Sequence, residues 1–153
     1  MTKSHYFTVA EAQAEDAPAI AEIHLTARQQ ALPYLKRAHT DDDTRTYFAQ
    51  VVVDRPRAWW VVRYQGQVAA YMLIDGEKLD HLYVSPRWQA RGFGSALLDH
   101  AKALSPGRLI LWTFQRNERA RAFYEARGFY SINATDGENE ESEPDVQYEW
   151  KAP

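Results

Sequence analysis

Apolar residues in the first part of the chain change from strand-like to helical spacing. A short apolar stretch at residues 6–10 predicts a first strand. From Ala17 onward, apolar positions recur with the period of a helix, and Asp16 stands where an N-cap is expected. Pro18 fits this interpretation, because the first turn of a helix tolerates proline. Residues 32–35, Leu-Pro-Tyr-Leu, are predicted to end this helix.

A second helix is predicted to begin after Thr40. Three aspartates follow this residue, and acidic side chains favour the positive end of a helix dipole. Tyr47, Phe48 and Val51 then share one face, and Pro56 lies beyond the expected end of the helix.

Three consecutive strands are expected next, because aromatic and β-branched residues dominate this part of the chain. Gln65-Gly66 and Asp75-Gly76 are turn signals that separate the strands, so a meander is predicted. The strands are expected at 58–64, 68–74 and 78–84.

The second half of the chain alternates between helical and strand-like patterns. A helix over 93–104 is predicted to precede a buried strand over 109–114. Asn117 is expected to cap a helix that runs to Arg127, with Gly128 as the left-handed residue that ends it. Two last strands are expected at 129–132 and 146–150.

The resulting order is β-α-α-β-β-β-α-β-α-β-β. A meander followed by strand-helix-strand units predicts an α/β fold (α+β with a mixed sheet) that has helices on both faces. A length of 153 residues, with no internal repeat and no long linker, favours a single domain over 1–153.

The composition of the chain excludes several classes of protein. The chain has no cysteine, which excludes a disulfide framework, a thiolate zinc site and a cysteine nucleophile, and is typical of a cytoplasmic protein. No apolar run approaches the ~20 residues that span a membrane, and residues 1–6 lack the apolar core of a signal peptide. We therefore expect neither a membrane partner nor a metal.

The net charge of −3 is unevenly distributed. Residues 136–149 contain seven acids and no Lys or Arg, and without these acids the rest of the chain carries +4. A nucleic-acid-binding protein usually has a stronger basic bias, so neither a nucleic-acid partner nor a nucleic-acid-associated adaptor is favoured.

A glycine-bearing loop, Gln89-Ala90-Arg91-Gly92-Phe93-Gly94, leads directly into the predicted helix at 93–104. Unpaired backbone N–H groups at a helix N-terminus form an anion site, and glycine permits close approach of a phosphate. The same pattern alone is also compatible with an ordinary tight turn. A dinucleotide fingerprint is excluded because Leu97 occupies the place of its third glycine, and the Gly-Lys-Ser/Thr of a Walker loop is absent.

With its flanks, this loop resembles the GNAT superfamily of N-acetyltransferases. Gln89, Gly92 and Gly94 match the family pattern Gln/Arg-x-x-Gly-x-Gly/Ala, and Leu-Tyr-Val-Ser-Pro at 82–86 matches the strand before it. Residues 117–129, Asn-Glu-Arg-Ala-Arg-Ala-Phe-Tyr-Glu-Ala-Arg-Gly-Phe, match a second pattern, Asn-x-x-Ala-x-x-Phe-Tyr-x-x-x-Gly-Phe. At Ala90 many relatives have glycine, and alanine is expected to fit unless the position needs a positive φ.

The resemblance implies a GNAT-like acyl-CoA N-acyltransferase fold and acetyl-CoA as co-substrate. The pyrophosphate would bind the backbone N–H groups from Gln89 to Ser95, and the pantetheine arm would pair like a strand with residues 82–84. Arg91 is the side chain chosen for a phosphate contact, with a solvated loop charge as the equal alternative. The residues implied to contact coenzyme A are Leu82, Tyr83, Val84, Gln89, Ala90, Arg91, Gly92, Phe93, Gly94, Ser95, Asn117, Phe123 and Tyr124.

The expected chemistry is direct attack by an amine on a thioester within a ternary complex. The chain has no cysteine and no Ser-His-Asp signature, which argues against a covalent acyl-enzyme. Catalysis would then come largely from positioning the two substrates. The resemblance gives Tyr124 the role of general acid for the departing thiolate. If Phe123 packs inward, Tyr124 can face the edge of the cleft, because neighbouring helix residues lie about 100° apart. The alternative for Tyr124 is a half-buried core tyrosine.

The identity of the base stays open at this point. Asp80 and His81 both lie on the strand that should line the cleft, but adjacent strand residues face opposite sides, so only one can point at the acceptor. His81 has a suitable unperturbed pKa, whereas the pKa of Asp80 would have to be raised. A water chain, with both residues as ordinary strand-face polar groups, is the third possibility.

The acceptor is expected to be a small-molecule amine or a peptide amine. The resemblance places Tyr34, Leu35 and His39 near it, together with the loop over 133–145. The acids of 136–149 either attract a cationic amine or form a mobile, solvated hairpin.

Two further points remain open from the sequence. A non-catalytic acetyl-CoA-binding sensor or regulatory module is the alternative function, and it is disfavoured by the presence of Tyr124. Relatives often pair through their late strands, which leaves a homodimer open.

Overall fold

The structure is a computed structural model, and it describes residues 6–54 and 58–153. The expectations about Pro56 and about the N-terminal residues 1–5 therefore lie outside the described residues. Over the described ranges, no helix combines the length and the apolar character needed to cross a membrane.

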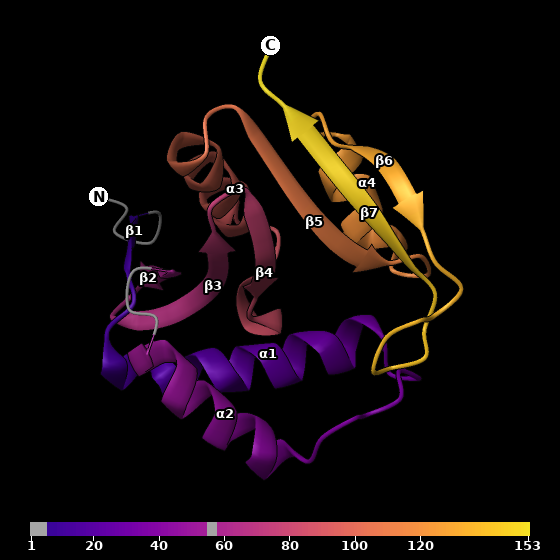
Figure 1. The fold of residues 1–153 in the computed structure, drawn as a ribbon. Helices are drawn as coiled ribbons and strands as arrows, with labels where there is room; N and C mark the ends of the chain where they lie inside the picture. Colours follow the sequence, from indigo (N-terminus) through magenta and orange to yellow (C-terminus); the bar gives the residue numbers. More distant parts are fainter. Residues whose placement is uncertain (1–5, 55–57) are drawn as a thin grey trace.

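Seven strands form one mixed sheet in the order β1-β2-β3-β4-β5-β7-β6. All neighbouring pairs are antiparallel except β4 and β5, which are parallel. Figure 1 shows the strands together with the helices that cover them. The strands are β1 (Phe7–Glu11), β2 (Trp59–Tyr64), β3 (Gln67–Asp75), β4 (Lys78–Val84), β5 (Arg108–Phe114), β6 (Tyr130–Ala134) and β7 (Asp145–Lys151).

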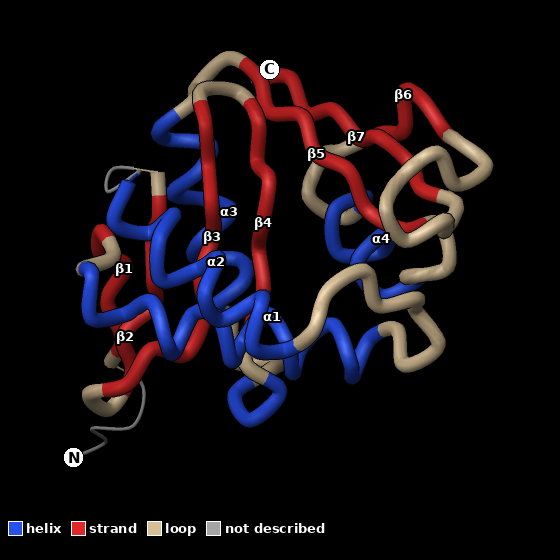
Figure 2. The backbone as a smooth tube through the Cα atoms, turned by 60° about the horizontal axis from the view of Figure 1, so that its bottom comes forward, coloured by secondary structure: helices blue, strands red, loops and turns tan. Residues whose placement is uncertain are grey.

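The sheet is divided between β4 and β5. Their register contains one pair, Lys78 with Ile110, and the backbone N–H of Ile110 donates to the Glu77 carbonyl at 2.8 Å. Beyond this point the two parallel strands move apart, as the tube view in Figure 2 shows. The edge of β4 that faces β5 therefore lacks a partner strand over most of its length, within the described part of the chain.

Helices cover both faces of the sheet, which confirms the predicted α/β architecture. On one face, α1 (Ala17–Ala31) and α2 (Asp41–Asp54) enclose a core that includes Ile20, Phe48 and Trp59. On the other face, α3 (Phe93–Leu104) and α4 (Glu118–Glu125) pack over a core that includes Leu97, Leu98 and Tyr148. Two short 3₁₀ turns, Ala14–Asp16 and Pro86–Trp88, connect the elements.

Local signals in the sequence account for most element boundaries. The hydroxyl of Thr40 accepts from the backbone N–H of Asp43 at 3.1 Å, and the Asn117 side chain accepts from Ala120 at 3.1 Å, so both predicted caps are confirmed. Gln65 and Gly66 both have positive φ, as a tight hairpin turn requires. Gly128 has φ +90° and follows α4, which ends at Glu125, two residues before the predicted Arg127.

Asp16 differs from the expectation that its side chain caps α1. It precedes the helix but makes no capping hydrogen bond. Its carboxylate instead accepts two bonds from the Arg63 guanidinium, at 2.7 and 3.0 Å, and one from the backbone N–H of Gln13 at 2.7 Å. This bidentate pair ties the start of α1 to β2, because the planar guanidinium matches both carboxylate oxygens at once.

Candidate active site

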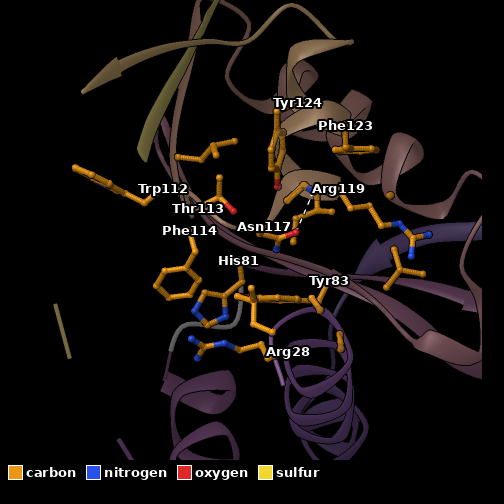
Figure 3. Close-up of a pocket in the computed structure, with 18 of the residues that line it drawn as sticks. Arg28, His81, Tyr83, Trp112, Thr113, Phe114, Asn117, Arg119, Phe123 and Tyr124 are labelled. Atoms are coloured by element: carbon orange, nitrogen blue, oxygen red, sulfur yellow. Dashed lines mark hydrogen bonds between the residues drawn. The ribbon is translucent and has the colours of Figure 1, made fainter. Parts of the chain in front are cut away.

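The separation of β4 from β5 opens a cavity of about 940 Å³. Its walls come from β4 and β5, the loop over 89–95, α1 and α4, so it reaches from one face of the sheet to the other. Figure 3 shows side chains from these elements converging on it. A volume of this size lies in the range of pockets that bind small-molecule ligands or cofactors.

The loop that precedes α3 has the properties of an anion cradle. Within the described chain, the backbone N–H groups of Phe93, Gly94 and Ser95 have no hydrogen-bond acceptor, as is normal for the first turn of a helix. Gly92 has φ +84°, and a Cβ built on it would have no atom within 4 Å. The backbone is therefore open to a bulky anion here, and the residues fit a pyrophosphate.

Ala90 adopts φ +62°, in the left-handed region. The condition under which alanine was not expected to fit is therefore met. The loop takes this conformation although a Cβ is unfavourable there, at a cost of about 1–2 kcal/mol. The backbone strain lies directly beside the anion cradle.

Arginines surround the cradle, but not the one that the sequence singled out. Arg91 donates to the Tyr64 hydroxyl at 3.1 Å and its guanidinium lies 5.5 Å from the centre of that ring, outside the residues that line the cavity. Arg119 and Arg127 do line the cavity. Arg119 donates to the Gln89 side chain at 2.9 Å, and Arg127 holds the Ser95 hydroxyl at 2.8 Å.

Two aromatic residues of α4 reach the cavity, and their burial is the reverse of the expectation. Tyr124 is 7% exposed and packs on Phe129 and Tyr148, with ring centres 5.4 and 6.4 Å away. Phe123 is only half-buried, and the Arg127 guanidinium covers one face of its ring at 3.9 Å. Figure 3 shows the Tyr124 oxygen pointing into the cavity near Thr113 and Asn117.

Burial also affects the proton affinity of this tyrosine. Desolvation raises the pKa of the Tyr124 hydroxyl above its usual range, and the proximity of Tyr83 adds to the effect. The phenol therefore keeps its proton throughout the neutral range.

A second cavity of about 460 Å³ lies between α1, α2 and the segment over 35–39. It adjoins the first, because both are lined by the same five residues, His24, Arg28, Leu32, His81 and Glu141. The site is therefore two-chambered, and its junction contains two imidazoles, a guanidinium and a carboxylate.

Of the two candidates for the base, His81 lies at this junction. Its Nδ1 is 3.0 Å from the Tyr71 hydroxyl, and its ring stacks on His24 with centres 5.3 Å apart. Asp80 is exposed and lines only the larger cavity. The register steps from Leu73–His81 to Ile74–Leu79, so Asp80 is the extra residue of a β-bulge.

Three acids near the junction have cationic or imidazole partners, and two of them, Glu141 and Glu143, are largely shielded from solvent. In the β6–β7 loop (residues 135–144), Glu141 accepts from Arg28 at 3.1 Å and Glu143 accepts two bonds from Arg116 at 2.7 Å. Glu140 lies 3.4 Å from His39. The loop is thereby fastened to α1 and to the segment that follows it, which neither of the two expectations for these acids described.

The segment after α1 also shapes the second chamber. Leu35 and His39 line it, whereas Tyr34 lies outside both sets of lining residues. The Arg116 guanidinium sits over the Tyr34 ring at 3.8 Å. Tyr34 therefore belongs to the fastening of the β6–β7 loop rather than to the wall of the chamber.

Sequence reasoning missed several residues of the site, chiefly His24, Arg28 and Tyr71. His24 and Arg28 are one helical turn apart on α1, so they share a face, but nothing local indicates that this face meets β4. Tyr71 is a buried strand residue like many others. Their role depends on long-range packing.

The likeness to known proteins agrees with this arrangement. The profile of the acetyltransferase (GNAT) family matches residues 17–129. Among curated proteins, peptidyl-lysine N-acetyltransferase YiaC of Escherichia coli K12 is 27% identical over 126 residues, which are 82% of this chain and 84% of that protein. Peptidyl-lysine N-acetyltransferase YjaB of Salmonella typhimurium LT2 is 35% identical over 71 residues, 46% of this chain and 48% of that protein.

Solved structures share the fold along almost the whole chain. Apo YjaB from Escherichia coli superposes with a TM-score of 0.76 at 21% identity, covering 97% of this chain and 99% of that one. The PaiA N-acetyltransferase of Thermoplasma acidophilum, solved with coenzyme A, has a TM-score of 0.70 at 16% identity, with 95% and 99% coverage. By its sequence match and its fold, the chain belongs to the acetyltransferase (GNAT) family and is an acetyl-CoA-dependent acyltransferase.

Proposed function

We propose that this protein transfers the acetyl group of acetyl-CoA to a primary amine, the side-chain amine of a lysine in a peptide or protein. The observation that carries the proposal is the two-chambered site. A cavity with an anion cradle meets a second, separately walled cavity at His24, Arg28 and His81. Such a geometry suits direct transfer between two substrates held at the same time.

Residues of the larger chamber suit the donor. Acetyl-CoA supplies the thioester carbonyl that the amine attacks and the thiolate that leaves. The first-turn N–H groups of α3 would hold the pyrophosphate, with Arg119 and Arg127 as the nearest lining cations. The open edge of β4 at Leu82, Tyr83 and Val84 would pair with the pantetheine arm.

Tyr124 is proposed as the general acid. Its hydroxyl faces the cavity beside Thr113 and Asn117, and burial keeps it protonated. A thiolate leaving into the same desolvated space has its own pKa raised, which brings the two groups closer to a match. The phenol then donates to the sulfur as the C–S bond breaks.

The acceptor class is supported by the relatives and by the second chamber. YiaC and YjaB carry the name peptidyl-lysine N-acetyltransferase. In this chain, apolar Leu35 and Phe48 line the second chamber together with the carboxylates of Asp43 and Glu141. An aliphatic chain that ends in an amine combines the same two properties.

The test is release of free coenzyme A on addition of lysine peptides, with small amines and polyamines as competing acceptors. Tyr124→Phe is expected to lower kcat by 10²-fold or more, the usual worth of a general acid, while acetyl-CoA affinity changes little. Tyr130→Phe removes a hydroxyl from β6, outside both chambers, and should leave kcat unchanged.

Other results would point elsewhere. Tight acetyl-CoA binding without release for any amine would favour the sensor or regulatory module. Release with small amines alone would retain the reaction and reject the peptide acceptor. Unchanged turnover in Tyr124→Phe would remove this residue from the mechanism.

A further inference from the structure

A chain of hydrogen bonds connects α1 to His81 through the interior. The Tyr71 hydroxyl lies 2.9 Å from His24 Nδ1 and 3.0 Å from His81 Nδ1. At the far end of the chain, the Arg28 guanidinium lies 3.4 Å from His24 Nε2. Tyr71 is fully buried, so its hydroxyl is confined to these two partners among the described residues.

The chemistry of the four groups gives this chain one direction. A guanidinium only donates, so His24 must present a lone pair at Nε2 to Arg28. A neutral His24 then carries its proton on Nδ1 and donates it to the Tyr71 oxygen. A phenol has a single proton, which Tyr71 must direct at the remaining partner, His81 Nδ1.

His24 is held neutral, as this direction requires. Burial lowers the pKa of His24 to about 3, and the nearby His81 and Arg28 contribute to the decrease. A charged His24 would carry protons on both nitrogens and would point one of them at the Arg28 guanidinium.

We propose that Arg28, His24 and Tyr71 hold His81 in the tautomer with its proton on Nε2, so that His81 serves the reaction as a hydrogen-bond donor and not as the base. His81 is then a candidate to bind an acceptor or thioester oxygen at the junction of the chambers. Its role in the reaction rests on the proposed acetyl transfer, whereas the tautomer itself does not.

Reversal of the chain explains why His81 is a poor base. In the proposed tautomer, Nε2 of His81 already carries a proton and cannot accept another. To act as a base through Nε2, His81 would first have to carry its proton on Nδ1 instead. A proton on Nδ1 turns the Tyr71 hydroxyl toward His24, and the His24 proton then moves to Nε2, facing Arg28. Asp80 or a water chain is left to remove the proton of the amine.

The tautomers are measured directly on the ligand-free, ¹⁵N-labelled protein. Long-range ¹H–¹⁵N spectra separate protonated from unprotonated imidazole nitrogens, and His24→Gln and His81→Gln variants assign the signals among the five histidines. We expect His24 with its proton on Nδ1 and His81 with its proton on Nε2. The opposite tautomer at either residue in the unmodified protein overturns the proposal.

Two variants then separate the links of the chain. In Tyr71→Phe, which keeps the ring in the core, His24 should keep its tautomer because Arg28 remains. His81 should lose its preference, with the tautomer ratio falling about tenfold or more, the factor expected for a lost hydrogen bond between well-placed partners. In Arg28→Met, both histidines should lose their preference. An unchanged His81 ratio in Tyr71→Phe contradicts the chain.

Glu141→Gln is the matched control. It removes the negative charge beside Arg28 but leaves the guanidinium and its direction of donation intact, so both tautomers should persist. Because none of these spectra requires turnover, an inactive protein with the expected tautomers would reject the proposed function and retain the chain. An active protein with the opposite tautomers would do the reverse.

Discussion

At the scale of single residues, the site contains a backbone conformation that its own side chain disfavours. Ala90 has φ +62° between Gln89 and the α3 cradle, and left-handed geometry costs an alanine about 1–2 kcal/mol. A glycine removes this strain but gains about 0.5–1 kcal/mol of entropy in the unfolded chain. The two effects leave a net benefit for glycine at this position.

Ala90→Gly is therefore expected to raise the free energy of unfolding by about 0.5–1 kcal/mol. Urea denaturation measures the change, and acetyl-CoA affinity should be retained because the backbone path of the loop is already the one that glycine prefers. Ala96→Gly, inside α3, is the matched control and should change stability in the opposite direction. A loss of stability in Ala90→Gly would show that the strain is relieved by contacts of the methyl group.

Single residues also show which parts of the site could be predicted from the sequence. The local patterns of the loop and of the cap indicate Gln89, Gly92 and Asn117, and the family resemblance adds Tyr124. All four line one cavity. Arg91 and Arg119 could not be told apart, since the direction of a long side chain depends on what it packs against. Arg91 finds the Tyr64 ring, and this leaves Arg119 to face the cradle.

At the scale of elements, the order of strands and helices follows from the sequence, but the β6–β7 loop does not. Caps such as Thr40 and Asn117 act within one turn, so they can be found by spacing. The loop is positioned by Arg28 and Glu141, which are 113 residues apart. The acids of residues 136–149 predicted either attraction of a cationic amine or a mobile, solvated hairpin. The arginines that pair with them lie in other parts of the chain, so their contacts could not be predicted from the sequence.

The loop also depends on one glycine. Gly137 has φ +111°, and a Cβ there would come within 3.0 Å of the Ser142 carbonyl carbon and 3.1 Å of the Glu143 nitrogen. Both neighbours are backbone atoms, so they cannot move aside without disturbing the loop. Glu143 is also the residue that accepts two bonds from Arg116.

Gly137→Ala is expected to lower the free energy of unfolding by about 1–3 kcal/mol and to raise KM for the amine several-fold, because the loop carries Glu140 and Glu141 into the second chamber. Acetyl-CoA affinity should change less than KM for the amine, because only Asn139 and Glu141 of this loop line the larger chamber, away from the cradle. Steady-state kinetics with each substrate varied in turn measures both. Gly107→Ala, where a Cβ meets nothing within 4 Å, is the control, and equal effects of the two substitutions would exclude this role for the loop.

At the scale of the whole molecule, stability is linked to pH through a partly buried histidine in the site, His24. The pKa of His24 is about 3 in the folded protein, mainly because of burial, against about 6.5 when it is unfolded. Below about pH 6.5, His24 therefore binds a proton in the unfolded chain but not in the folded protein, so the free energy of unfolding falls as the pH drops. The loss is of the order of 3 kcal/mol between pH 7 and pH 4.

Carboxylates affect the stability of the fold in a different pH range. The Arg116 hydrogen bonds lower the pKa of Glu143, and the bonds from Arg63 and Gln13 outweigh desolvation to lower that of Asp16. Groups with a lowered carboxyl pKa stabilise the fold above their unfolded pKa near 4, and this stabilisation is lost only as pH falls further. The change in the free energy of unfolding between pH 6.5 and pH 4.5 is thus dominated by histidine. It can therefore be measured separately from the contribution of the carboxylates.

His24→Gln tests this linkage, because glutamine can donate to Tyr71 and accept from Arg28 but does not titrate. Urea unfolding at pH 7, 5.5 and 4.5 should show a steep loss of stability in the unmodified protein and a much flatter profile in the variant. His39→Gln changes an exposed histidine and should keep the steep profile, since it leaves His24 and its surroundings in place. If His24→Gln is as steep as the unmodified protein, the fold does not lower the pKa of His24, and the linkage of stability to pH through this residue is excluded. A flat profile in the variant would show that the folded protein keeps His24 neutral, which is the state in which Nε2 can accept from Arg28.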